Sequence, residues 1–202
     1  MKAQFDSIQV SVMDAASKEM ANIGQNLISG LEELGLNQAQ KKAVAGKIEE
    51  AVDGVELLVG GKAKQAFGLI KDGIDKNLDE IDIIPKELRK QIGNMCKGSV
   101  DQLDNLVSDA VGQASKSVKE VSGAILDQGL KALKSTFDNL GSWLKGEKTS
   151  EQAMAGIKGA WKEAGQEVSK SFSEAKKSFV EKVGGKKADP KEKTEAPISK
   201  SR

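Results

Sequence analysis

The chain has 202 residues, a formal net charge of +1, 30% charged residues and only 3% aromatic residues. Histidine and tyrosine are absent, there is one cysteine, and all but two of the 31 basic residues are lysine. These counts argue against histidine-based acid–base catalysis, an internal disulfide framework and arginine-mediated recognition of nucleic acid. The three prolines, at positions 85, 190 and 197, leave long stretches without a helix breaker, so we expect an all-α protein.

Charge is distributed unevenly along the chain. Residues 1–128 contain 15 basic and 20 acidic residues, a net charge of −5, whereas residues 129–202 contain 16 and 10, a net charge of +6. Five of the seven aromatic residues also lie in the basic part. Positive charge and aromatic area are therefore enriched together, and this coincidence is the main functional clue in the sequence.

The first part of the chain shows three consecutive helical patterns. Apolar residues recur every three or four positions over residues 5–34, 37–59 and 63–81. Asn37 with Gln40 fits a capping box, and Gly35 stands where a left-handed helix cap is expected. Because the connections are short, neighbouring helices must be antiparallel, and we expect residues 5–83 to form three helices that share one core.

Two further helices are expected before residue 145. Pro85 suits the start of a short helix that ends before Gly98, and Ser99 with Gln102 fits the capping box of a long helix. The apolar face of that long helix rotates after Leu126, so the pattern predicts a break or kink near Gly129.

The last predicted helix is strongly amphipathic. Its apolar residues keep helical spacing at Met154, Ile157, Trp161, Ala164, Val168, Phe172, Ala175 and Phe179. Thr149 with Gln152 fits a capping box at its start, and Gly184 fits its end. After that point the chain is polar and contains two prolines, which predicts a disordered tail over residues 184–202.

Together these patterns predict an elongated multi-helix bundle of six or seven amphipathic helices. Three parts are expected: an acidic helical bundle at 1–98, long amphipathic helices at 99–183 that become aromatic and basic toward their end, and the tail at 184–202. Glycines inside the helical patterns each cost roughly 1 kcal/mol relative to alanine. We interpret them first as sites of close helix packing, and second as a sign of weak helices that respond to a surface.

No set of residues in the sequence indicates catalysis or a cofactor. Cys96 has no imidazole to activate it, and a buried small side chain is the favoured interpretation. Carboxylate pairs such as Glu32 and Glu33 lie at the polar edges of amphipathic helices, where solvated surface is expected. We therefore expect no enzyme activity, no metal and no cofactor. The chain also lacks an apolar run long enough for a transmembrane helix or a secretory signal peptide, which favours a cytoplasmic location or export without a classical signal.

The sequence predicts a non-enzymatic interaction protein that binds a partner or itself through amphipathic helices, possible forms being an exported effector or a structural component. The alternative is a peripheral protein that binds a lipid surface through helices at 130–145 and 150–183. Specific binding of nucleic acid is not expected. The candidate surface for protein or lipid comprises Phe137, Trp143, Trp161, Phe172, Phe179, Lys158, Lys162 and Lys176. Because Gly156, Gly159 and Gly165 weaken the last helix, we expect Trp161 to face an external surface.

Overall fold

The computed structural model describes residues 19, 22–56, 63–115 and 119–184. These residues form a helical segment at 22–33, followed by α2 (Gln38–Glu56), α3 (Ala63–Asp79), α4 (Lys86–Ser115), α5 (Lys119–Lys145) and α6 (Ser150–Gly184). The described ranges contain no strand, which confirms the all-α class. The predicted tail lies outside the described residues, apart from Gly184 at the end of α6.

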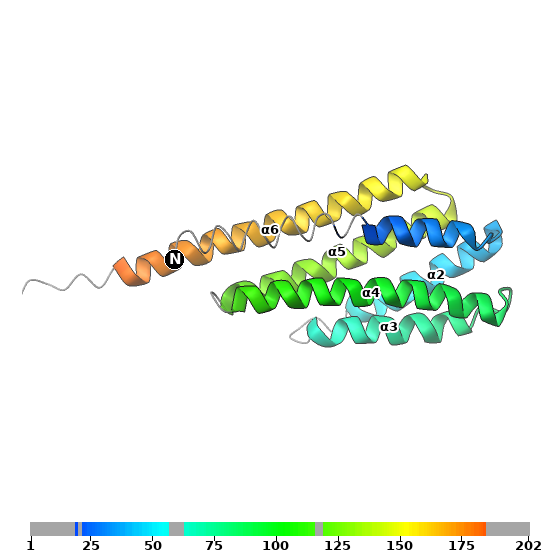
Figure 1. Cartoon of the computed structure of the whole chain (residues 1–202), viewed down its shortest axis with the longest axis horizontal. Helices are drawn as coiled ribbons and strands as arrows, with labels where there is room; N and C mark the ends of the chain where they lie inside the picture. Colours follow the sequence, from blue (N-terminus) through cyan, green and yellow to red (C-terminus); the bar gives the residue numbers. More distant parts are fainter. Residues whose placement is uncertain (1–18, 20–21, 57–62, 116–118, 185–202) are drawn as a thin grey trace, which may run out of the picture.

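The helices form an elongated bundle in which successive elements run in opposite directions (Figure 1). Helix α5 lies at its centre, since it packs against α2, α3, α4 and α6. Its buried apolar residues include Val121, Ile125, Leu130, Leu133, Phe137, Leu140 and Leu144. The hydrophobic core of the described chain is therefore organised around one helix.

Two of the predicted capping boxes are confirmed in reciprocal form. The Gln40 backbone N–H donates to Asn37 Oδ1 at 3.0 Å while the Asn37 backbone N–H donates to Gln40 Oε1 at 3.1 Å. Thr149 and Gln152 form the same pair of hydrogen bonds at the start of α6, at 3.0 and 3.2 Å. Gly35 has a φ of 62°, as the left-handed cap requires. These hydrogen bonds satisfy backbone donors that the first helical turn leaves unpaired.

Two predicted helix boundaries are wrong. Helix α4 continues through Ser99, whose hydroxyl donates back to the Met95 carbonyl at 3.0 Å and so forms no cap. The two apolar patterns join there because Cys96, Val100 and Leu103 form one continuous buried face. The expected boundary between 1–98 and 99–183 thus falls in the middle of α4.

Helix α5 likewise runs straight through Gly129, where a break was expected. The interruption lies instead between the end of α4 at Ser115 and the start of α5 at Lys119. The glycine has a packing role, because a Cβ placed on it would lie 2.6 Å from Val107 Cγ2 on α4. A glycine is present at position 129 because α4 and α5 approach each other closely there, and not because the helix is kinked.

The first three helical elements do not form a separate unit. Segment 22–33, α2 and α3 are helical and alternate in direction (Figure 1), but the parts of the prediction at 5–18, 20–21 and 57–62 lie outside the described residues. Gly24 in the segment faces Ile157 of α6, and Gly30 faces Met95 of α4. The core is therefore shared with the later helices.

Glycines stand at several helix–helix contacts. A Cβ on Gly73 would lie 3.2 Å from Ala51 Cβ, where α3 crosses α2, and a Cβ on Gly156 would lie 2.6 Å from Asn139 Cγ, where α6 crosses α5. Other glycines, such as Gly159, have no atom within 4 Å of that position. Close packing thus explains the first group, whereas the second group only weakens its helices.

Gly156 and Gly159 offer a matched pair of substitutions within one helix. We expect Gly159→Ala to stabilise the protein by about 0.4–1 kcal/mol, because alanine restricts the unfolded chain and meets open space in the fold. Gly156→Ala should instead destabilise it by about 1–3 kcal/mol, because the new methyl group collides with Asn139. Urea unfolding of both variants measures the difference, and effects of equal sign would contradict the packing described here.

Candidate functional site

The predicted aromatic surface lies mainly inside the chain. Phe137, Trp143, Trp161 and Phe172 are 0%, 9%, 8% and 2% exposed, respectively. The expectation that Trp161 faces an external surface is therefore not met in this structure. The side chains of Phe179 and Lys176 lie outside the described residues, whereas Lys158 and Lys162 are exposed on α6.

Trp161 packs on α5 and its polar group is satisfied there. The indole Nε1–H donates to Thr136 Oγ1 at 3.0 Å, and the Thr136 hydroxyl donates to the Ala132 carbonyl at 2.8 Å. A buried indole N–H normally requires such a partner. The glycine at position 156 lets α6 approach α5 closely, and this is the physical reason why the aromatic face finds its surface within the chain.

A second polar contact joins α5 to the connection between the helices. Asn139 is buried, accepts a hydrogen bond from Lys148 Nζ at 2.7 Å through Oδ1, and donates to the Ser135 carbonyl at 2.7 Å through Nδ2. Gly156 lies directly over this amide. The α5–α6 interface therefore combines an apolar stripe with two specific polar contacts.

The end of α5 is clamped to α2. Lys145 Nζ donates to both carboxylate oxygens of Glu49, at 2.7 and 2.6 Å, and Gln38 Nε2 donates to the Lys145 carbonyl at 2.9 Å. Lys41 Nζ lies 5.4 Å from the centroid of the Trp143 ring, within the range of a cation–π contact. The hydrogen bonds to Glu49 raise the pKa of Lys145 above its ordinary value. The last turn of α5 is thus fixed to the bundle.

Residues 146–149 connect this clamped turn to α6, and we call α5, α6 and this connection the α5–α6 hairpin. Gly146 has a φ of 80°, and its N–H donates to the Trp143 carbonyl at 2.9 Å. A side chain at this position would be strained, because L residues rarely adopt such a φ. The chain therefore reverses direction at a position whose backbone conformation favours glycine.

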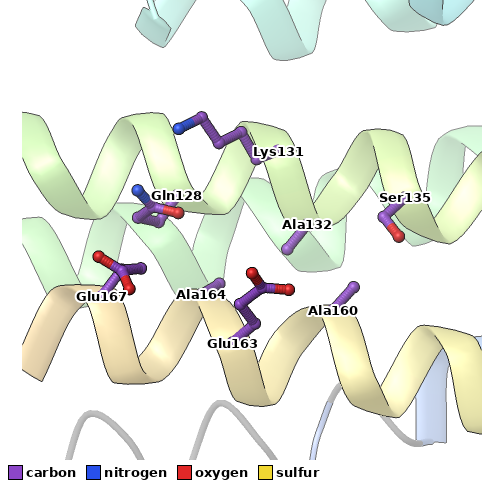
Figure 2. Close-up of a pocket in the computed structure, with 8 residues that line it drawn as sticks. All are labelled: Gln128, Lys131, Ala132, Ser135, Ala160, Glu163, Ala164 and Glu167. Atoms are coloured by element: carbon purple, nitrogen blue, oxygen red, sulfur yellow. The ribbon is translucent and has the colours of Figure 1, made fainter.

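A groove lies along the seam between α5 and α6 and is lined by side chains from both helices (Figure 2). Ala132, Ala160 and Ala164 lie between the two helices, while Glu163 and Glu167 come from α6. The groove is also lined by Gln128, Lys131 and Ser135 of α5. Small side chains at its base and charged ones beside it are typical of a solvated helix–helix seam, and no catalytic arrangement is evident in them.

The structure offers little reactive chemistry elsewhere in the described chain. Cys96 is fully buried, and burial raises the pKa of its thiol to about 12, so it has no thiolate character at neutral pH. Among the described residues, no three His, Cys, Asp or Glu side chains are grouped so that they could hold a metal ion. Within the same ranges, no helix combines the length and apolarity that crossing a bilayer requires.

Sequence patterns identified the aromatic half of the α5–α6 interface and missed its polar half. Thr136 and Asn139 lie on the buried face of α5, yet their types gave no indication of burial. A usable signal was present in Trp161, since its N–H demands an acceptor when the ring is buried. Glu49 was missed as well, because its partner Lys145 is 96 positions away in the sequence.

The chain matches no protein-family model, and comparisons with curated proteins and with solved structures gave no match. What the protein does is therefore inferred from its own geometry.

Truncating Trp161 tests whether its surface is internal. We expect Trp161→Ala to lower the free energy of unfolding by about 3–5 kcal/mol, because a buried ring and its hydrogen bond are lost. In a Trp143→Phe background, the fluorescence of Trp161 should be blue-shifted before any partner is added. Lys162→Ala, an exposed neighbour, should change stability by less than about 0.5 kcal/mol. Red-shifted emission from the isolated protein would show that the ring is in water.

The Glu49–Lys145 pair predicts a pH dependence. Lys145→Gln should destabilise the protein by about 1 kcal/mol at neutral pH. Because the folded-state pKa of Lys145 lies above 10.5, this stabilisation persists from neutral pH up to 10.5 and is lost as the pH rises through the folded value. On the alkaline side of neutral pH, the stability difference between wild type and variant, from urea unfolding, should therefore stay constant up to pH 10.5 and shrink above it. Lys170→Gln removes a more exposed pair within α6 and should cost less; equal losses would contradict the clamp.

Proposed function

We propose that this chain is a non-enzymatic interaction protein that binds a protein partner, or associates with itself, through the apolar face that α6 shares with α5. The observation that carries the proposal is how α6 is attached. Among helices α2 to α5, only α5 packs extensively against α6, and segment 22–33 also contacts α6, where Gly24 faces Ile157. Opening the α5–α6 hairpin would present the stripe containing Trp161 and Phe172 while the contacts among α2, α3, α4 and α5 stay in place.

Several features support an interaction role over catalysis. The sequence contains no histidine, and Cys96 is buried with a raised pKa, so the side chains most often used as general bases or nucleophiles are missing or inert. Exposed glycines such as Gly159 weaken α6 as an isolated helix. A weak amphipathic helix gains most of its stability from the surface on which it packs, and this favours a helix that can move between surfaces.

One observation favours a lipid surface as the second candidate. Lys158 and Lys162 are exposed on α6, next to the stripe that holds Trp161. An aromatic apolar face flanked by lysines suits a helix lying in a membrane interface. In that case the protein would be membrane-peripheral, and the opened α6 would lie on the bilayer surface.

A disulfide across the hairpin tests whether it must open. A Cβ on Gly156 would lie 2.6 Å from Asn139 Cγ, so the Cβ atoms of positions 139 and 156 are at most ~4 Å apart, within disulfide range. We expect Asn139→Cys/Gly156→Cys, in a Cys96→Ala background and oxidised at high dilution so that the disulfide forms within single chains, to lose association, and we expect reduction to restore it. Sedimentation of the protein alone, and with vesicles of equimolar phosphatidylcholine and phosphatidylglycerol, measures both candidate functions.

A second crosslink provides the matched control. Ala51→Cys/Gly73→Cys joins α2 to α3, where the corresponding Cβ distance is 3.2 Å, and it leaves the α5–α6 hairpin unconstrained. This oxidised control should associate like the unmodified protein. If the α5–α6 crosslink leaves self-association and vesicle binding unchanged, the shared face is not the binding surface and the proposal fails.

A further inference from the structure

We infer that the partner of α6 is a second copy of this chain, and that two copies exchange α6 so that each α6 packs on the α5 of the other. This inference rests on the proposed function and names its partner. It follows from three features of the hairpin: the way α6 is attached, the contacts on α5 that receive it, and the connection at residues 146–149.

The first feature is that α6 can leave while the contacts among α2, α3, α4 and α5 stay in place. Among these helices α6 packs extensively on α5 alone, and it also contacts segment 22–33, where Gly24 faces Ile157; a second copy offers the same α5 and the same segment. The Glu49–Lys145 pair and the Gln38 hydrogen bond hold the end of α5 on α2 without involving α6. When α6 departs, α5 therefore stays in the bundle with its receiving face intact.

The second feature is the specificity of that receiving face. Thr136 offers a hydroxyl acceptor for the Trp161 indole N–H. The Asn139 side chain lies so close to the backbone of α6 that only a glycine fits opposite it. An α6 from another copy brings the same tryptophan and the same glycine in the same spacing. Exchange therefore recreates every α5–α6 contact, whereas an unrelated helix would leave Thr136 and Asn139 mismatched.

The third feature is the connection. It spans four residues and reverses the chain at Gly146. Residues other than glycine rarely adopt its φ of 80°. In the exchanged form α6 continues away from its own α5, so residues 146–149 no longer need this turn. Strain placed on the turn should accordingly favour exchange, as is general for short hinge loops.

The α5–α6 crosslink distinguishes closed from exchanged molecules. Two differently tagged preparations of Asn139→Cys/Gly156→Cys, in the Cys96→Ala background, are mixed at high concentration under reducing conditions, then diluted and oxidised. We expect covalent dimers carrying both tags on a denaturing, non-reducing gel, because exchanged copies place position 139 of one chain against position 156 of the other. The α2–α3 pair, Ala51→Cys/Gly73→Cys, should give only crosslinks within one chain.

Strain at the hinge should then change the yield. Gly146→Ala is expected to lower the dissociation constant of the dimer by about tenfold, because the closed turn is strained and the exchanged connection is not. Gly35→Ala places similar strain at a φ of 62° outside the hairpin and should leave the yield of the 139–156 interchain crosslink unchanged.

Two results would overturn the inference. One is crosslinking only within single chains at every concentration, and the other is equal dimer yields for Gly146→Ala and Gly35→Ala. Either result leaves the proposed function standing if the oxidised hairpin still loses vesicle binding. If the crosslink affects neither vesicle binding nor self-association, the proposed function itself fails.

Discussion

The close approach of α5 to its neighbours is the constraint on which the rest of this structure depends. With few aromatic residues available, the core is built largely from alanine, valine, isoleucine and leucine, and such side chains reach across an interface only when the backbones lie close together. Gly129 permits this approach on the α4 side and Gly156 on the α6 side. These glycines lower the intrinsic stability of their helices, and packing at the helix–helix interfaces offsets that loss.

Helix α6 is attached to the bundle by a different set of contacts. Helices α2, α3 and α4 are linked to one another or to α5 by ion pairs such as Lys97–Asp75 and Lys134–Asp53, in addition to their apolar contacts. Helix α6 is held to α5 by its apolar stripe, by Trp161 and by the Asn139–Lys148 contact at its connection. This face fits α5 closely, and among α2 to α5 the helix α6 packs extensively on α5 alone. These two properties are the basis of the interaction role proposed above.

Local signals in the sequence predicted much of the fold. The all-α class, the Asn37 and Thr149 caps and the turn at Gly35 each depend on residues a few positions apart, and each is present. The predictions at Ser99 and Gly129 failed because the same residue types serve another purpose inside a long helix, and only the packing partner distinguishes the two uses. For a related reason, the sequence did not reveal that Trp161 is buried against α5 in the single chain. Amphipathicity shows that a face is buried. Which surface it packs against depends on residues of another helix, here Thr136.

The contact between Gln38 and Lys145 also has a consequence for how the chain reaches this fold. Hairpins such as α3–α4 and α5–α6 join neighbours in sequence, and segments of this kind form early because little chain entropy is lost when they close. The Gln38–Lys145 hydrogen bond joins residues 107 positions apart, so it closes a loop that contains α2, α3, α4 and α5. Docking of α2 onto the end of α5 is then a late folding step. A nascent chain that has emerged only as far as α4 cannot complete the core. Its α2 lacks the α5 surface on which it packs until that helix has been synthesised.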